Sequence, residues 1–280
     1  MSYYTVLGLD KEPFSTSPDP AFFFESHQHH TVLLKLMIEI RLKRGLSLIL
    51  GDVGTGKTTL SRKLFQMLKE REDILFGMIL DPVYDSEQLF LEALVRTFKI
   101  DLPVPANILD YKEAIKTFLY TKAVEQGMTV VLLIDEAQKI NPASLEFLRV
   151  LLNYETNEFK LLQVVILSQL ELLPRLKTLH NLWDRISMKF VLNPLDAQET
   201  KEMIAFRLKQ AGYKFPRSLF SDDAVNQIYQ YTRGYPRKVA LLCHDALKHV
   251  VAESKVFVDT EVINDLINQD LAVRGTVVNG

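Results

Sequence analysis

The stretch Gly51-Asp-Val-Gly-Thr-Gly-Lys-Thr58 constrains this chain most, because it fits the pattern G-x-x-x-x-G-K-[ST] directly after an apolar run at residues 46–50. A strand, a glycine-rich turn and a helix in this order make several backbone N–H groups converge on one point, where they can hold phosphate. The apolar spacing of Leu60, Leu64 and Leu68 predicts that an amphipathic helix begins at Lys57. The stretch therefore predicts a phosphate-binding loop in its proper structural setting.

Each part of this loop has a predicted role in binding a nucleoside triphosphate, and the predicted cofactors are ATP and Mg²⁺. Lys57 would reach the β- and γ-phosphates, and the Thr58 hydroxyl would ligate the metal ion. Backbone amides of the loop and of the first helical turn would hold the phosphates. The predicted nucleotide-binding residues of this stretch are Gly51, Asp52, Val53, Gly54, Thr55, Gly56, Lys57, Thr58 and Thr59.

Composition narrows the class of protein. The chain has 280 residues, 48% of them hydrophobic, which suffices for one large domain or two smaller ones. A net charge of -2 predicts neither a strongly basic nucleic-acid binder nor an acidic tail. The single cysteine, Cys243, excludes an internal disulfide. No run reaches the ~20 apolar residues of a membrane helix, and no signal peptide is recognisable, so we expect a cytoplasmic protein.

Strand-like and helix-like segments alternate through the first two thirds of the chain. Apolar runs at 46–50, 74–80, 128–134, 162–167 and 188–192 read as strands, and amphipathic segments separate them. This alternation predicts an α/β fold: a three-layer αβα domain with a parallel sheet.

Beyond residue 193 the signals become helical. There we expect Asp196 with Glu199 to cap a helix, and further helices to begin at Ser221, Pro236 and Thr260, the last ending near Asn268. Before residue 193, we expect Asp85 with Gln88 to cap a helix and another helix to begin at Asn141-Pro142. The predicted organisation is an aromatic N-terminal arm (1–30), a nucleotide-binding domain (31–193), a small α-helical lid domain (194–270) and a frayed tail (271–280).

Two adjacent carboxylates, Asp135 and Glu136, follow the apolar strand that ends at Ile134. In a parallel sheet ligands bind beyond the carboxyl ends of the strands, so these side chains could meet the phosphate-binding loop. Asp135 would hold Mg²⁺ and Glu136 would polarise the attacking water, a division that γ-phosphate hydrolysis needs. The alternative is an exposed acidic turn after a core strand.

With these motifs the sequence resembles the AAA+ ATPases, and among them the general secretion pathway protein A family, which includes pilus-biogenesis ATPases. The resemblance spans about Tyr4 to Ile267. The stretches that carry it are Leu7-Gly-Leu9, Pro13-Phe14, Ser17-Pro-Asp-Pro20, the phosphate-binding loop, Leu133-Ile-Asp-Glu-Ala-Gln138, Leu151-Leu-Asn-Tyr-Glu155, Gly234-Tyr-Pro-Arg237 and Cys243-His-Asp-Ala-Leu247.

The resemblance implies further site residues. Gln169, with Ser168 as the less favoured choice, would sense the γ-phosphate or its water. Arg237 would be a second sensor that binds the nucleotide. Arg185 resembles an arginine finger that reaches the nucleotide of a neighbouring subunit, and Arg175 is the alternative.

Because aromatic side chains bury too much area to stay in water, we expect the aromatic arm to be ordered and to pack on the core. Its role has two interpretations of equal weight. By resemblance it would pack near the base and contact it through Phe14 or Pro18. Otherwise it would only cover an edge of the nucleotide-binding domain. Secretion members of the family often continue into a membrane helix and a peptidoglycan-binding domain. This sequence stops at Gly280 without either, which puts direct membrane anchoring and cell-wall binding in doubt and favours the short pilus-associated type or an unplaced relative.

The resemblance implies an ATP-hydrolysing protein that acts as a homo-oligomeric, hexamer-like ring and drives or regulates assembly of a secretion or pilus system. Its partners would be the proteins of that system, and peripheral attachment to the inner membrane stays open. The competing interpretation is a transposition-type ATPase that forms ATP-dependent filaments on DNA, although near-neutral charge counts against it. A third is an ATP-gated switch that hardly turns over.

Overall fold

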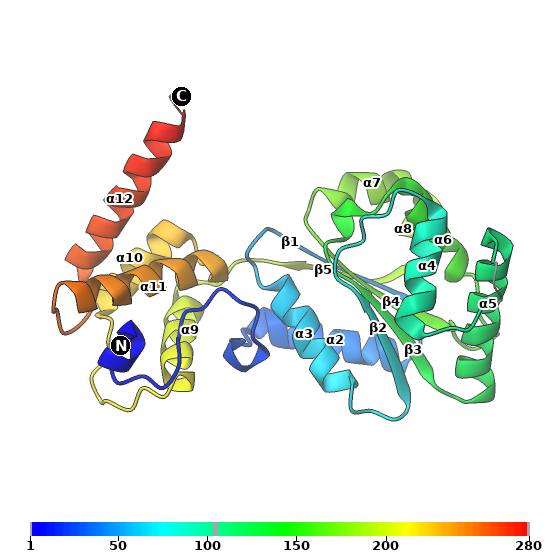
Figure 1. Ribbon diagram of the computed structural model, residues 1–280, viewed down its shortest axis with the longest axis horizontal. Helices are drawn as coiled ribbons and strands as arrows, with labels where there is room; N and C mark the ends of the chain where they lie inside the picture. Colours follow the sequence, from blue (N-terminus) through cyan, green and yellow to red (C-terminus); the bar gives the residue numbers. More distant parts are fainter. Residues whose placement is uncertain (1, 103–105, 279–280) are drawn as a thin grey trace. The chain divides into compact units, whose positions relative to one another are not determined.

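A computed structural model describes residues 2–102 and 106–278. The chain forms two compact units, which Figure 1 labels by element. Residues 27–53 and 57–192 form the first, which we call the sheet unit. Residues 1–26, 54–56 and 193–280 form the second, which we call the helical unit.

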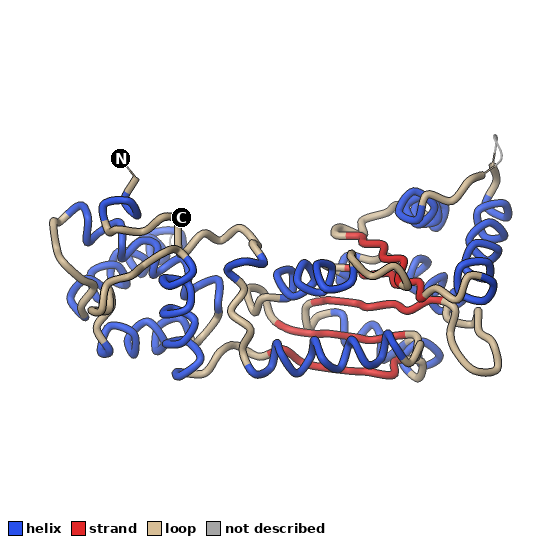
Figure 2. Tube along the Cα trace, turned by 90° about the horizontal axis from the view of Figure 1, so that it is seen from below, coloured by secondary structure: helices blue, strands red, loops and turns tan. Residues whose placement is uncertain are grey.

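The sheet unit contains one five-stranded parallel sheet in the order β2-β3-β4-β1-β5 (red in Figure 2). Its strands are β1 (Leu46–Gly51), β2 (Ile74–Ile79), β3 (Thr129–Ile134), β4 (Leu162–Ser168) and β5 (Ile186–Leu192). The predicted α/β fold with a parallel sheet is confirmed.

Helices cover both faces of this sheet. Successive residues of a strand point to opposite faces, so both sets of side chains become buried. On β3, Leu132 and Ile134 belong to one large apolar cluster, while Val131 and Leu133 face the other way and are equally buried. The helices and turns of this unit are α2 (His27–Arg41), α3 (Lys57–Leu68), α4 (Glu87–Phe98), α5 (Ile108–Tyr120), the π-turn η2 (Thr121–Glu125), the 3₁₀ turn η3 (Ala137–Lys139), α6 (Pro142–Leu151), α7 (Leu172–Thr178) and α8 (His180–Trp183).

Helix starts follow local capping chemistry. Asn141 caps α6 as predicted, with proline at the first helical position. The prediction for α4 is wrong by one residue, because the Ser86 hydroxyl, not Asp85, accepts the N–H of Leu89. Both Asp and Ser can cap a helix, so residue type alone does not distinguish them. Ser86 is the cap because α4 begins at Glu87.

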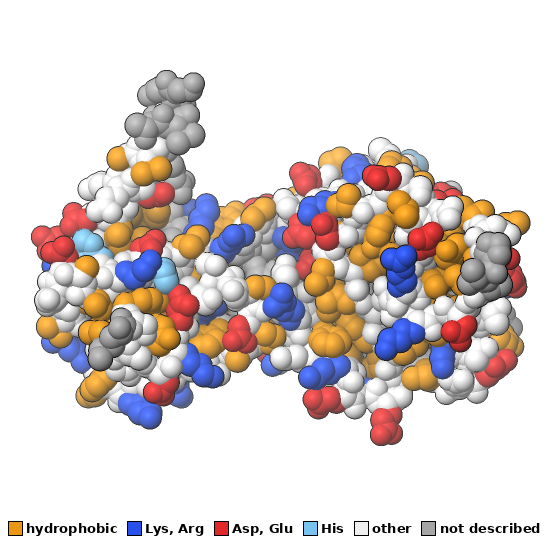
Figure 3. Space-filling model, viewed as in Figure 1, with side chains coloured by type: hydrophobic (Ala, Val, Ile, Leu, Met, Phe, Trp, Pro, Cys, Tyr) orange, Lys and Arg blue, Asp and Glu red, His pale blue; other side chains and the backbone are white. Residues whose placement is uncertain are grey.

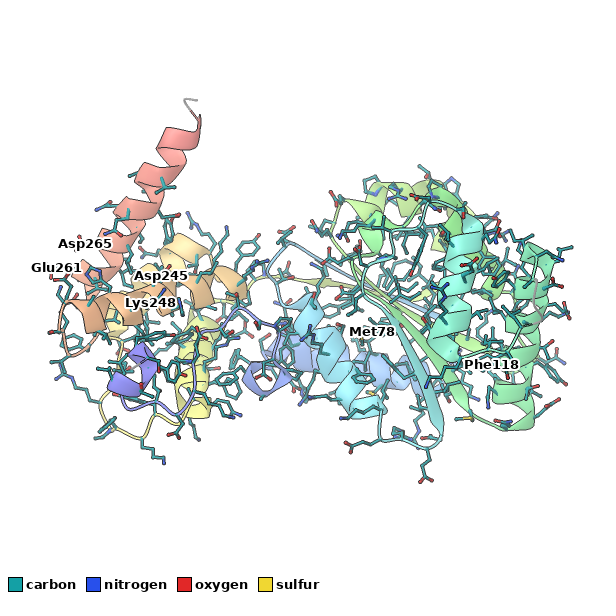
Figure 4. The ribbon with its side chains drawn as sticks, in the orientation of Figure 1. Met78, Phe118, Asp245, Lys248, Glu261 and Asp265 are labelled. Atoms are coloured by element: carbon teal, nitrogen blue, oxygen red, sulfur yellow. The ribbon has the colours of Figure 1, made fainter. Side chains whose placement is uncertain are left out.

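The helical unit contains α1 (Tyr3–Val6), the 3₁₀ turn η1 (Pro20–Phe22), α9 (Ala197–Gln210), α10 (Asp222–Thr232), α11 (Pro236–Ala252) and α12 (Thr260–Val278). The predicted capping box of Asp196 and Glu199 at α9 is confirmed. Helix α12 continues to Val278, well past the predicted end near Asn268. Helices α11 and α12 pack together, and Figure 4 labels Asp245 and Lys248 on the first and Glu261 and Asp265 on the second.

The N-terminal arm is part of the core of the helical unit. Phe14 is 1% exposed and packs edge-to-face on Phe220, with ring centroids 5.9 Å apart. Arg207 of α9 donates hydrogen bonds to the carbonyls of Ser15 and Phe22. Phe14 exposes almost no surface that a base could contact, which contradicts the predicted base contact through this residue. Pro18 is half-buried, and its proposed contact stays a prediction.

Among the described residues, no helix has both the length and the apolarity that crossing a membrane requires.

Candidate functional site

The strand order brings three chain segments together at one edge of the sheet. Strand β4 lies between β1 and β3, and parallel strands present their carboxyl ends at the same edge. The phosphate-binding loop follows β1, and Asp135 and Glu136 follow β3. Ser168 and Gln169 stand at the end of β4 between them. Three of the predicted motifs therefore meet, although they are far apart in sequence.

The loop after β1 has the backbone that its glycines predict. Gly54 has φ 85° and Gly56 has φ 98°, a left-handed region that side chains other than glycine rarely adopt. Thr55 between them is fully buried, and Val53 is exposed and can contribute only through its backbone. Helix α3 begins at Lys57, as predicted, so its N-terminal amides and dipole end at the loop.

Lys57 is buried, with 6% of its surface exposed. Its Nζ donates hydrogen bonds to the carbonyls of Gly51 at 2.7 Å and Asp52 at 2.9 Å. Burial lowers the pKa of Lys57, and the carboxylates of Glu136, Asp135 and Asp52 oppose that shift. This ammonium group is therefore close enough to both acidic residues after β3 to feel their charge.

Asp135 is a buried carboxylate, with only 1% of its surface exposed. Burial raises its pKa, while hydrogen bonds from the Glu136 backbone N–H and the Thr58 hydroxyl favour the charged form. The link to Thr58 unites the two predicted metal ligands. Ser61, which was not predicted as a site residue, is also buried, and its hydroxyl lies 3.5 Å from Asp135 Oδ2.

Glu136 is half-buried and has φ 51°, an uncommon backbone conformation for a side-chain-bearing residue. Gln138 Nε2 donates to Glu136 Oε2 at 2.6 Å. Gln138 Oε1 accepts from the Ser168 hydroxyl and from the Gln169 backbone N–H, each at 3.1 Å. Gln138 was not predicted as a site residue, although its position two residues after Glu136 in the Asp-Glu-Ala-Gln peptide was an available signal.

These hydrogen bonds distinguish the two sensor candidates, Gln169 and Ser168. Gln169 takes part through its backbone N–H, whereas Ser168 is completely buried and takes part through its side chain. The structure therefore favours Ser168 as the side chain connected to Glu136. The sensor role of either residue stays a prediction.

The three predicted arginines lie in different settings. Arg175 on α7 donates to the carbonyls of Gln138 and Ile140, so its guanidinium is engaged within its own chain. Arg185 follows α8 and donates through Nε to the Asn181 carbonyl at 3.1 Å. Both arginines therefore donate within their own chain, Arg175 through its two terminal nitrogens and Arg185 through Nε, and the arginine finger stays a prediction. Arg237 lies in the first turn of α11 in the helical unit, and its contact with nucleotide stays a prediction.

Comparison with known proteins identifies the family. The family described as "AAA domain" matches residues 40–176. The General secretion pathway protein A of Aeromonas hydrophila is 36% identical over 247 residues, which is 88% of this chain. The chain belongs to the general secretion pathway protein A family of AAA+ ATPases. The chain spans 44% of the length of that relative.

Solved structures show the same fold at low identity. Cdc6p from Pyrobaculum aerophilum has a TM-score of 0.65 and 17% identity, covering 89% of this chain and 68% of its own. The ORC2 protein of Aeropyrum pernix has a TM-score of 0.66 and 16% identity, covering 93% and 71%. The RuvB branch migration motor of Thermotoga maritima has a TM-score of 0.55 and 18% identity, covering 85% and 68%. These similarities support the α/β fold of the family.

Proposed function

We propose that this chain binds ATP with Mg²⁺ and hydrolyses the γ-phosphate. The observation that carries the proposal is the meeting of three groups at one edge of the sheet. These are the Lys57 ammonium at the start of a helix, the buried carboxylate of Asp135 and the carboxylate of Glu136. A cation for the phosphates, an oxygen ligand for the metal ion and a base for water are the groups that this reaction requires.

The residues present fit a magnesium ion. Mg²⁺ prefers oxygen ligands, and the Asp135 carboxylate and the Thr58 hydroxyl are two oxygen groups already joined by a hydrogen bond. Burial raises the pKa of Asp135, and a divalent cation beside it would offset the cost of its charge. When bound, Mg²⁺ would neutralise charge on the β- and γ-phosphate oxygens.

The residues of the chain divide the remaining work. The loop amides and Lys57 hold the phosphates and fix their orientation. Glu136 orients the attacking water and receives its proton on a carboxylate oxygen. Asp135 stays ionised to hold the metal ion, helped by the hydrogen bonds from Glu136 and Thr58.

We further propose that the protein acts as a homo-oligomer, with Arg185 completing the site of a neighbouring subunit. Its work would be to drive or regulate assembly of a secretion or pilus system. The 36% identity to a general secretion pathway protein A supports this assignment of process.

DNA binding remains the competing function. It requires a surface where basic side chains outnumber acidic ones. On the face that Figure 3 shows, Lys and Arg side chains are interspersed with Asp and Glu, which gives this alternative no support there. ATPase activity that duplex DNA stimulates, and that weakens steeply with salt, would favour it.

Two substitutions test hydrolysis at this site. Lys57→Ala should abolish ATP binding, because it removes the buried cation that faces the phosphates. Glu136→Gln should keep ATP binding but reduce turnover by about 10²- to 10⁴-fold, the usual contribution of a general base. Equilibrium binding of a fluorescent ATP analogue and phosphate release measure the two effects.

Matched controls come from the same sheet unit. Lys63→Ala on α3 and Glu146→Gln on α6 should leave both quantities unchanged. ATP affinity that survives Lys57→Ala would contradict the loop assignment. Wild-type turnover in Glu136→Gln would remove Glu136 from its role.

A further inference from the structure

Gln138 is held so that its side-chain amide can point only one way. The backbone N–H of Gln169 can only donate, so the group 3.1 Å from it must be the oxygen of the Gln138 amide. The Ser168 hydroxyl lies 3.1 Å from the same oxygen and 3.1 Å from the Gln169 carbonyl, so its single proton is shared between these two acceptors. The nitrogen end therefore faces Glu136 Oε2, 2.6 Å away, and can only donate to it.

The backbone that carries Gln138 is fixed as well. It lies in the 3₁₀ turn η3, whose first residue, Ala137, is fully buried. The Arg175 guanidinium donates to the carbonyls of Gln138 and Ile140, which binds this turn to helix α7. The Gln138 side chain thus starts from an anchored backbone and ends on two groups at the carboxyl end of β4.

Glu136 needs such a partner, because its long side chain has several rotatable bonds and is only half-buried. A general base has to lie within about 3 Å of the proton that it accepts. A displacement of about 1 Å can lower a rate by about 100-fold. The hydrogen bond from Gln138 Nε2 is the contact that restricts the direction of the Glu136 carboxylate.

We propose that Gln138 is a positioning residue for Glu136. It orients the carboxylate and connects it to the end of β4 through Ser168 and Gln169, so that a movement at the end of β4 is transmitted to the base. The inference rests on the proposed hydrolysis. It assigns the buried Ser168 hydroxyl to the same path.

The most specific test is Gln138→Glu. A carboxylate at this position can still accept from Ser168 and from the Gln169 N–H, but it cannot donate to Glu136 and it repels it. We expect turnover to fall by ~100-fold, while the dissociation constant for ATP stays at the wild-type value. The repulsion should lower the melting temperature, but the variant should still unfold cooperatively. Phosphate release, equilibrium binding and thermal unfolding measure the three quantities. Wild-type turnover in the folded variant would overturn the proposal.

A matched control separates positioning from general support of β4. Gln163 is buried near the other end of the same strand and also bonds at both ends, with the Gly45 N–H and the Lys160 carbonyl each at 2.8 Å. Gln163→Ala should lower stability and leave turnover per bound ATP unchanged. Gln138→Ala should lower turnover. Equal turnover losses in the two variants would show a merely structural role and overturn the proposal.

A double variant tests whether Gln138 acts through Glu136. In a Glu136→Ala background, adding Gln138→Ala should cause no further loss in single-turnover hydrolysis, because the group to be positioned is gone. Losses that multiply would overturn the inference. A result that overturns the positioning role of Gln138 can be told apart from a result that overturns the proposed hydrolysis. If the wild-type protein hydrolyses ATP and Gln138→Glu matches it, only the positioning role falls, whereas an inactive wild-type oligomer overturns hydrolysis itself.

Discussion

At the scale of one residue, burial of the Asp135 carboxylate is unfavourable for its charged form. A carboxylate loses the solvation of its charge when it is buried, and this loss raises the pKa of Asp135. The hydrogen bonds from Glu136 and Thr58 and the charge of Lys57 oppose the shift without cancelling it. The ligand-free protein therefore carries an unfavourable charge that the bound metal ion would compensate.

We expect Asp135→Asn to stabilise the ligand-free protein at pH 7 and to abolish Mg²⁺-dependent hydrolysis. Replacing a buried charge by a neutral group of the same shape should raise the free energy of unfolding by about 1–2 kcal/mol. Since the folded pKa of Asp135 exceeds the unfolded value of ~3.9, the cost is absent below that pH and grows until pH passes the folded pKa. Urea unfolding of both proteins from acid to neutral pH measures the difference.

The control for this prediction is Asp81→Asn, which removes an exposed carboxylate paired with Lys139. It should not stabilise the protein. An Asp135→Asn variant that is less stable than the wild type at pH 7 would show that the hydrogen bonds to the charged form outweigh its burial.

At the scale of elements, close packing of α4 on β2 depends on the absence of a side chain at Gly77. A Cβ built there would lie 2.6 Å from Thr97 Cγ2 and 2.8 Å from the ring of Phe98. Both distances are far shorter than a normal contact, so the helix or the strand would have to move. Figure 4 labels the neighbouring Met78 on β2 and Phe118 on α5, whose ring packs on Phe98.

Gly77→Ala should therefore lower the free energy of unfolding by about 1–3 kcal/mol, the usual range for overpacking a core. Thr97→Ser removes the closest methyl group, so the double variant should recover part of the loss. Thermal unfolding of the four proteins measures the coupling. If the two substitutions were additive, the close approach would not be the cause.

At the scale of the whole molecule, the proposed oligomer makes hydrolysis depend on two subunits at each site. An arginine supplied from a neighbouring subunit can raise the rate by about 10³- to 10⁵-fold. Arg185→Ala should therefore be nearly inactive while still binding ATP. Mixing it with Glu136→Gln subunits should restore activity, because some sites would then combine an intact Glu136 with an intact Arg185.

Arg175→Ala serves as the comparison in this mixing experiment. Arg175 donates to carbonyls of its own chain, so its loss should disturb η3 in every subunit and no mixture should rescue it. If no proportion of Arg185→Ala and Glu136→Gln subunits regains turnover, Arg185 does not act between subunits.

The sequence by itself determined the features that depend on neighbouring residues. The glycine spacing predicted the loop and the start of α3 at Lys57, and Asp196 with Glu199 predicted the cap of α9. Apolar runs predicted the five strands. Each of these rests on backbone conformation, capping or side-chain period within about ten residues, which the local sequence encodes.

The tertiary structure decided which of these segments meet. In the observed strand order, β4 lies between β1 and β3. This order places Ser168 within hydrogen-bonding distance of Gln138, which in turn donates to Glu136. The aromatic content of the N-terminal arm predicted that it packs on the core, but only the tertiary structure showed that Phe14 lies in the core of the helical unit. Contacts between residues distant in sequence leave no periodic pattern, because they follow from how the elements pack and from the groups that must be hydrogen-bonded once buried.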